Sequence, residues 1–226
     1  MRTDGGRTHV LLTGFGPFPG VPVNATMRLV PMLAEQAPRV FPDVRFSAHL
    51  LATEWETAPA RALQAVRETP PDLVLHFGVS PRARGFEIET RARNACQMSA
   101  DAAGALPPTA QLADGGVDFL GATLPVRHMV GRLRAHGIPA YASRDAGAYL
   151  CNALLWRVLE AHRESRAPRI GFVHIPASLA RPGGSNRGRS GACPLTWEQA
   201  VRGGLEIIAA GLGRPAVAAL SMPRGR

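Results

Sequence analysis

The sequence predicts an α/β fold: a three-layer α/β/α sandwich around a mostly parallel central sheet. Two observations lead to this class. Short apolar runs without polar alternation are typical of strands buried on both faces, and stretches of helical periodicity lie between them. Strands that alternate with helices are characteristic of such sandwiches. The chain has 226 residues, 46% of them hydrophobic, and no long linker divides it, so we expect a single domain over residues 1–226.

Each element follows from its local pattern. Apolar runs bounded by turn residues predict four buried strands, over residues 9–13, 72–77, 121–126 and 170–175, of which 121–126 is the weakest. Residues 41–51 are expected to form a further strand at an edge of the sheet. Helical spacing of apolar residues predicts five helices, over residues 24–36, 54–68, 128–136, 152–163 and 196–212.

Two segments carry neither pattern. Residues 94–121 are rich in Ala, Gly, Pro and Asp, and residues 177–194 are rich in Gly, Ser and Arg. Long irregular segments in a compact fold are functional loops or disordered stretches, and we expect 177–194 to be exposed and mobile.

The charge of the chain raises the question of nucleic-acid binding. All 26 basic residues are arginine, and the net charge is +9. The arginines are spread from Arg2 to Arg226 and are not interleaved with aromatic residues for base stacking. We therefore expect a solvated basic surface and no nucleic-acid partner. The nucleic-acid alternative predicts salt-sensitive binding to DNA or RNA.

The cysteine count and the termini bear on location. Three cysteines cannot form a disulfide framework, and an odd number is typical of a reducing compartment. The first residues lack the apolar region and cleavage site of a signal peptide, and no apolar run reaches 18 residues. We expect a cytoplasmic protein without membrane association. Cys96 and Cys193 fit no metal-ligand spacing and are not expected to be catalytic.

Chemistry-bearing residues stand at three places. Cys151 lies where a helix begins, with Asn152 as its expected N-cap, and a thiolate is stabilised by a helix N-terminus. His174 ends a predicted buried strand, where parallel sheets gather catalytic groups, but His76 has the same local setting. A nucleophilic cysteine needs a base, and the base needs an orienting partner, for which Glu87 and Glu89 are both available. On the residues alone, a buried structural cysteine, a core histidine and surface ion pairs are the simpler alternatives, and they stay open.

Four motifs in order carry a resemblance over nearly the whole chain. They read LLTGFGPFPGVPVNAT at residues 11–26, PDLVLHFGVSPRARGFEIETRARN at 71–94, a segment from TLPV to AGAYLCN at 123–152, and FVHIP at 172–176. With these motifs the chain resembles the pyroglutamyl peptidase type I family, also called pyrrolidone-carboxylate peptidases. That resemblance implies a phosphorylase/hydrolase-like variant of the sandwich and a cysteine exopeptidase that removes N-terminal pyroglutamate from peptides.

The resemblance also assigns roles. It implies that Cys151 is the nucleophile, His174 the base and Glu89, rather than Glu87, the acid that orients the histidine; His76 is then a strand position. The substrate-binding residues that it implies are Phe15 and Phe18 around the flat lactam ring, the backbone near Val79, and Tyr149 and Leu150 at the border of the pocket. It implies no metal and no cofactor, and a homo-oligomer, either a dimer or a tetramer.

The chain departs from the family pattern after the implied acid. Thr90 stands where the family usually carries a basic residue, and Pro81 and Arg82 replace a Gly-Gly pair. Residues 97–109 (QMSADAAGALPPT) replace a stretch that borders the substrate in the family and contain no arginine. A related amidase with weak or altered activity is therefore the alternative to a pyroglutamyl peptidase.

Overall fold

The computed structural model describes residues 6–165, 167–181 and 193–217. Its main sheet consists of β1 (Thr8–Phe15), β2 (Val44–Leu51), β3 (Leu73–Ser80), β4 (Phe86–Glu89), β7 (Ala140–Ser143) and β8 (Arg169–Pro176). The strand order is β2–β1–β3–β8–β4–β7. Strands β2, β1, β3 and β8 are mutually parallel, whereas β4 runs antiparallel to β8 and carries β7 parallel to itself. The predicted α/β sandwich with a mostly parallel sheet is confirmed, as is the edge position of β2.

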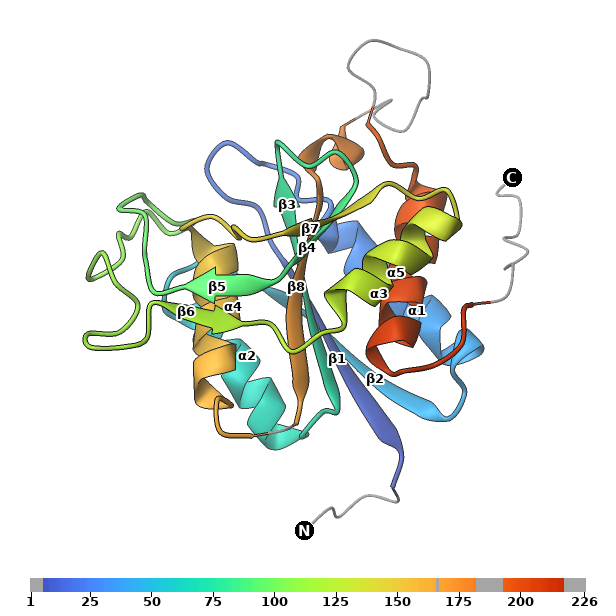
Figure 1. Ribbon diagram of the computed structural model, residues 1–226. Coiled ribbons are helices and arrows are strands. Elements are labelled where there is room, and N and C mark those ends of the chain that lie inside the picture. The colour runs from blue at the N-terminus through green and yellow to red at the C-terminus, as the bar shows by residue number, and fades with distance from the viewer. Residues whose placement is uncertain (1–5, 166, 182–192, 218–226) are drawn as a thin grey trace.

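Helices cover both faces of this sheet (Figure 1). One face packs against α1 (Thr26–Val40), α3 (Val126–Ala135) and α5 (Trp197–Gly211), and the other against α2 (Thr57–Glu68) and α4 (Leu150–Ala161). Successive strand residues point to opposite faces. Thus Val10 and Leu12 lie in the first core, and Leu11 lies in the second. Because both of their faces are buried, β1, β3 and β8 are mostly apolar, which is why their runs were recognisable in the sequence.

A small second sheet lies beside α4. It pairs β5 (Arg91–Arg93) antiparallel with β6 (Phe119–Gly121). Ala92 and Leu120 from these strands join the core under α4. The chain reaches β5 directly from β4, so the end of the main sheet and the start of α4 are linked through this small sheet (Figure 1).

The structure corrects two strand predictions. Residues 121–126 do not form a strand of the main sheet: β6 ends at Gly121, and α3 begins at Val126 directly after Pro125. Proline lacks a ladder donor and suits a helix start, which explains the outcome. The main sheet is completed instead by β7, which the sequence did not reveal because it has only four residues and Tyr141 in it is 44% exposed.

The two irregular segments behave differently. Residues 94–118 contain no helix or strand, as expected, but the end of the segment expected to be irregular, residues 119–121, forms β6 by pairing with β5. Of 177–194, residues 182–192 lie outside the described residues. The flanking parts are ordered: Ala177–Ala180 forms a 3-10 helix, and Leu179 and Cys193 are buried in the α5 core. For these flanks the prediction of an exposed segment is wrong, because apolar side chains anchor both ends.

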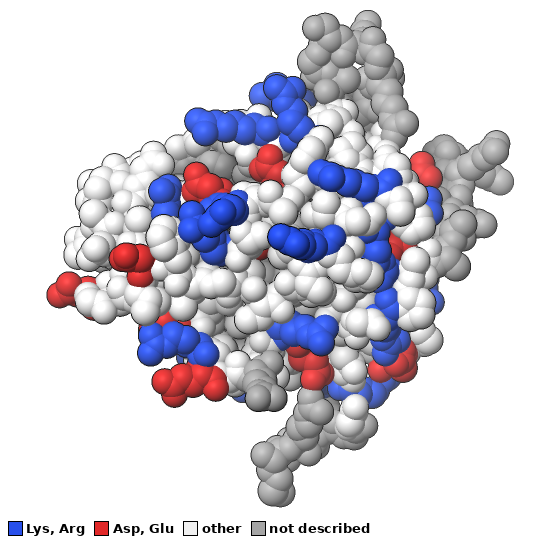
Figure 2. All heavy atoms as spheres, viewed as in Figure 1, with Lys and Arg blue, Asp and Glu red and all other residues white. Residues whose placement is uncertain are grey.

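Two surface properties complete the description. Within the described residues, no helix combines the length and the apolar character needed to cross a lipid bilayer. On the face that Figure 2 shows, arginine side chains are scattered among uncharged residues rather than joined in one continuous patch.

Candidate active site

The candidate site lies where the parallel strands end, on the sheet face that α4 covers. Gly78 of β3 pairs with His174 of β8, so the His174 side chain and the open space at Gly78 lie on this same face. Cys151 reaches them from the first turn of α4, and Glu89 from the last residue of β4. Four segments distant in sequence therefore bring their polar groups to one place.

Cys151 stands at a helix N-terminus, as predicted, but the cap differs. Helix α4 begins at Leu150, and its N-cap is Tyr149 in extended conformation, without a side-chain hydrogen bond to the helix. The first-turn N–H groups lack intrahelical partners, and no side-chain cap occupies them. They are oriented to stabilise negative charge at or near the Cys151 sulfur.

The predicted N-cap role of Asn152 is wrong. Its buried side chain accepts a hydrogen bond from the Arg93 N–H at 2.8 Å and donates to the carbonyls of Arg93 and Ala95 at 2.8 and 3.0 Å. Asn152 is the third residue of α4 and therefore lies inside the helix, past the N-cap position, and its amide instead joins α4 to β5. This bracket fixes the start of α4, and with it Cys151.

Gly78 makes room for the cysteine sulfur. A Cβ atom at this position would lie 2.9 Å from the Cys151 Sγ and 2.6 Å from the Phe172 ring. Such distances are too short for real contacts, so only glycine lets the thiol lie against the strand here. Because Gly78 and His174 are paired neighbours, this approach also brings the sulfur beside the imidazole.

His174 and Glu89 form a buried hydrogen-bonded pair. The Nδ1 atom of His174 lies 2.8 Å from the Oε1 of Glu89, and the two residues are 6% and 0% exposed. The Cys151 sulfur lies close enough to the same ring to raise the pKa of the imidazole. One imidazole thus links a carboxylate to a thiol, which is the arrangement that a base and its orienting acid require.

The environment keeps His174 protonated. Burial by itself lowers the pKa of this imidazole, but the adjacent Cys151 sulfur and the Glu89 carboxylate outweigh burial and raise the pKa to about 10. The imidazolium therefore lies next to the Cys151 sulfur at the N-terminus of α4.

Glu87 lies on the same face but does not contact Nδ1. The strand register pairs it with His174, and it is half-buried. Burial raises the pKa of its carboxyl, the His174 charge lowers it, and the Glu89 charge raises it again, with a net increase. Ligand atoms of Glu87, Glu89 and His174 lie within 4.8 Å of one another, a spacing compatible with a cation. The hydrogen bond between Glu89 and His174 already occupies one ligand atom of each of these two residues.

His76, the other candidate from the sequence, has a structural environment. It is fully buried, its Nδ1 lies 2.7 Å from the Thr13 hydroxyl, and burial lowers its pKa to about 3. It carries no charge at neutral pH, and its ring packs 6.2 Å from Phe172. Thr13 and His76 therefore join β1 to β3 below the site.

Aromatic side chains border the cysteine on the side of the β1–α1 loop. Phe15 is 2% exposed and packs on Phe172 with ring centroids 6.3 Å apart. Phe18 is half-buried against Tyr149 at 5.8 Å, and Trp55 meets Tyr149 edge-on at 5.1 Å. Phe18 and Tyr149 are thus the partly accessible members of this group.

The loop that carries Phe18 is held by a defined set of hydrogen bonds. Asn24 donates to the Gly16 carbonyl at 3.1 Å, and Thr53 donates to the same oxygen at 3.0 Å. Phe18 and Val21 exchange backbone hydrogen bonds around Gly20, which has a φ of +81°. The glycines and the asparagine of the first motif therefore have a common structural purpose: they fix the loop beside the thiol.

Two further predicted residues offer backbone rather than side chains. Val79 lies in the core on the opposite face of the sheet, and Leu150 is fully buried under α4. What they present to the site is the main chain after Gly78 and the first N–H of α4.

Gly78 and Trp55 were not predicted to belong to the site, and Asn152 was expected there only as an N-cap. Trp55 is 7% exposed and is held by its indole N–H on the Ser99 carbonyl and by its backbone N–H on Asp101. Gly78 lies within the motif at residues 71–94, and Asn152 ends the motif at residues 123–152, directly after Cys151. Only their contacts reveal what they do.

Comparisons with known proteins decide the family. A family model described as pyroglutamyl peptidase matches residues 8–209. The chain belongs to the pyroglutamyl peptidase family. Among curated relatives, the pyrrolidone-carboxylate peptidase of Pseudomonas fluorescens is 34% identical over 179 residues, covering 79% of this chain and 83% of that protein. The enzyme of Vibrio vulnificus is 35% identical over 182 residues, covering 79% and 82%.

Solved structures of the family share the fold. The pyrrolidone carboxyl peptidase of the hyperthermophile Pyrococcus furiosus superposes with a TM-score of 0.79 at 26% identity, covering 91% of this chain and 99% of that one. The pyroglutamyl peptidase I of Bacillus amyloliquefaciens has a TM-score of 0.77 at 24% identity, covering 92% and 98%. Pyroglutamyl peptidases are cysteine-type peptidases, and this chain carries a cysteine and a histidine at its candidate site.

Proposed function

We propose that this chain is a cysteine exopeptidase that hydrolyses the amide bond after an N-terminal pyroglutamyl residue, with Cys151, His174 and Glu89 as its catalytic residues. The observation that carries the proposal is the convergence of these three residues in a member of the pyroglutamyl peptidase family. Peptides with an N-terminal lactam ring are the substrates.

The first half of the reaction forms a thioester. The Cys151 thiolate attacks the pyroglutamyl carbonyl, and the developing oxyanion is stabilised by first-turn N–H groups of α4. The His174 imidazolium donates its proton to the amine nitrogen as the carbon–nitrogen bond breaks, and the shortened peptide leaves. Glu89 holds the ring through Nδ1, so that the other ring nitrogen faces the reacting atoms.

The second half restores the enzyme. Neutral His174 takes a proton from water, which attacks the thioester carbonyl, and the carbon–sulfur bond breaks to release pyroglutamate. Cys151 and His174 return to the thiolate–imidazolium pair. The uncharged, flat lactam suits the aromatic border formed by Phe15 and Phe18, and its amide groups suit the main chain near Val79 and Leu150, beside Tyr149.

A chromogenic assay tests this function. The wild-type protein is expected to hydrolyse a pyroglutamyl chromogenic amide, and Cys151→Ala is expected to lose roughly three orders of magnitude or more of kcat. Cys96→Ala is the matched control, because that thiol lies outside the triad. Absence of turnover by the wild type, or equal turnover by Cys151→Ala, contradicts the proposal.

A substrate panel distinguishes the alternative of a related amidase. The segment after β5 lacks arginine, and Met98 in it is 55% exposed. If pyroglutamyl amides rank first among lactam and acyl amides, the peptidase reading holds; if another acyl group ranks first, the altered-amidase reading replaces it.

A homo-oligomer, a cytoplasmic location and the lack of a nucleic-acid partner stay predictions. Sedimentation, cell fractionation and nucleic-acid binding at physiological salt, respectively, can check them.

A further inference from the structure

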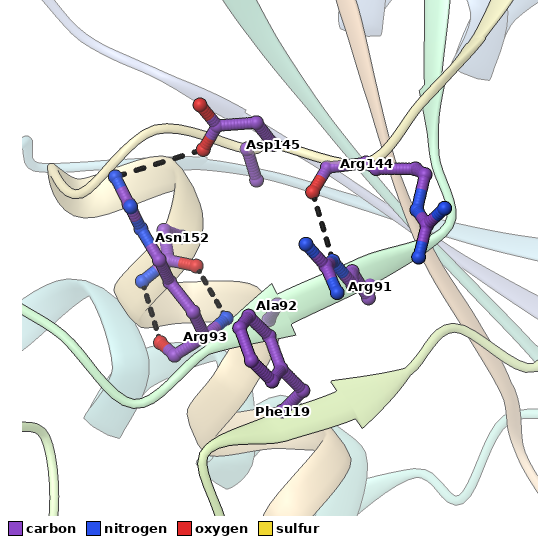
Figure 3. A pocket seen from close by; sticks show the side chains of 8 residues that line it. Arg91, Ala92, Arg93, Phe119, Arg144, Asp145 and Asn152 are labelled. Atoms are coloured by element: carbon purple, nitrogen blue, oxygen red, sulfur yellow. Dashed lines mark hydrogen bonds and ion pairs between the residues drawn. The ribbon is translucent and has the colours of Figure 1, made fainter.

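A small hollow lined by three arginines lies next to the first turn of α4. It has a volume of about 180 Å³ and lies between β5 and the segment that enters α4 (Figure 3). Its lining residues are Arg91, Ala92, Arg93, Phe119, Arg144, Asp145, Ala146 and Asn152. We refer to it as the arginine hollow.

The arginine hollow has excess positive charge. Three guanidinium groups line it, and among the lining residues Asp145 supplies the one carboxylate, 3.6 Å from Arg93. Asp145 and Arg93 are 69% and 41% exposed at their side chains, so this ion pair is open to water and weak. An anion that enters the hollow therefore meets unneutralised cations.

Two of the guanidinium groups are held in place in advance. Arg91 donates through Nε to the Arg144 carbonyl at 3.0 Å, and its guanidinium stacks 4.1 Å above the Phe119 ring. Arg93 donates through Nε to the Gly147 carbonyl at 3.0 Å. Figure 3 shows Arg91 bonded to the Arg144 carbonyl on one side of the hollow and Arg93 facing Asp145 on the other. Groups fixed in this way lose little conformational freedom when they bind a ligand.

The position of the hollow connects it to the reacting groups. Asn152 follows Cys151 directly and grips the backbone of Arg93. Arg91 stands two residues after Glu89, and Arg144 belongs to the short segment between β7 and α4. Adjacent Cα atoms are about 3.8 Å apart, and two or three extended residues span roughly 7–10 Å. The proposal below therefore requires the leaving portion of a bound peptide to pass Asn152 and enter the hollow within this span.

We propose that the arginine hollow binds a carboxylate of the leaving peptide, so that pyroglutamyl peptides with a carboxylate two or three residues after the ring are preferred substrates. This inference rests on the proposed function and names its substrate class. The carboxylate has two possible sources, an acidic side chain or the free C-terminus of a short peptide. A planar carboxylate fits the paired donors of a guanidinium in either case.

Three matched peptides distinguish the two sources. They are pyroglutamyl-Ala-Glu amide, pyroglutamyl-Ala-Gln amide and pyroglutamyl-Ala-Gln with a free C-terminus. Each kcat/KM is divided by that of the same protein on a pyroglutamyl chromogenic amide, whose leaving group carries no carboxylate. We expect the wild type to prefer at least one of the two carboxylate peptides over the neutral one by about fivefold, the effect of a partly exposed ion pair.

Variants assign that preference to the hollow. Arg144→Gln is expected to reduce the ratio toward one, whereas Arg61→Gln, which removes an equal charge from the exposed face of α2, is expected to keep it. Equal rates on all three peptides overturn the inference, and so does an equal drop in Arg61→Gln, which means a general effect of net charge. If the wild type does not turn over the chromogenic amide, the proposed function fails; calorimetric binding of the three peptides to Cys151→Ala then tests the hollow by the ratio of Kd values.

Discussion

Two buried histidines on neighbouring strands show how differently one residue type can behave in the same sheet face. His76 on β3 and His174 on β8 both flank the Phe172 ring, at 6.2 and 4.8 Å between centroids. His76 has a hydroxyl partner, and its pKa is lowered to about 3; His174 has a carboxylate and a thiol, and its pKa is raised to about 10. Burial opposes the charged form in both cases, so the partners decide the outcome.

The two histidines differ in charge because only His174 borders β4. His76 is enclosed by parallel strands whose neighbouring side chains on this face are uncharged, such as Thr13. His174 borders β4, which runs antiparallel and delivers Glu89, and it faces the N-terminus of α4, which delivers Cys151. His76 thus lies between parallel strands, whereas His174 lies at the boundary where β4 pairs antiparallel with β8.

The largest expected effect comes from exchanging each histidine for asparagine. His174→Asn is expected to lower kcat/KM on a pyroglutamyl chromogenic amide by roughly 10³-fold or more, since the proton carrier is lost. His76→Asn can keep the Thr13 hydrogen bond and is expected to stay within about tenfold of wild type, while unfolding free energy falls by about 1–3 kcal/mol. Assays and denaturant titrations on both variants check this, and a greater loss of activity in His76→Asn would reverse the assignment.

Removing the carboxylate of Glu89 is expected to have the next largest effect. Glu89→Gln keeps the size of the side chain but removes a charge that raises the pKa of His174, so that pKa falls below about 10. The alkaline limb of the rate profile should move to lower pH, and kcat should drop by about 10- to 1000-fold. Glu87→Gln is the control on the same strand, and a larger shift of the limb in this control would favour Glu87 as the orienting acid.

Gly78 tests whether the close approach of the thiol matters. Gly78→Ala places a methyl group against the Cys151 sulfur and the Phe172 ring, so we expect about tenfold lower kcat and a loss of about 1–3 kcal/mol in unfolding free energy. In Gly131→Ala, on α3, the new Cβ meets no atom within 4 Å, and both quantities should stay near wild type. Unchanged activity in Gly78→Ala would mean that the sulfur can move aside without cost.

The pH dependence of stability separates the two histidines by sign. His76 has a folded pKa of about 3 against 6.5, so the unfolded chain binds its proton first, and stability is lost as pH falls from 6.5 toward 3, by up to about 1.4 kcal/mol per pH unit. His174 has a folded pKa of about 10, so its stabilising contribution is complete below pH 6.5 and is lost as pH rises toward 10. His76→Asn should flatten the acid side, and His174→Asn the alkaline side. Denaturant titrations across both windows measure the slopes, and no change in either variant would contradict the assigned protonation states.

The sequence determined more of the fold than of the site. Strands β1, β3 and β8 were predicted because burial on both faces makes them mostly apolar, and the helices were predicted because their apolar residues recur at helical spacing. The placement of Cys151 at a helix start was also predicted from the sequence. Short elements with mixed exposure, such as β7, left no comparable signal.

Only the tertiary structure decided which polar groups meet. Glu87 and Glu89 are two residues apart on one strand, so a period of two puts both on the same face, and no local pattern separates them. The register pairs Glu87 with His174, yet it is Glu89 that reaches Nδ1. The same holds for Asn152, whose side chain binds β5 rather than capping its own helix. Local sequence fixes periodicity and helix ends, but strand register and the packing of α4 are non-local, and they select the partners that give His174 its charge.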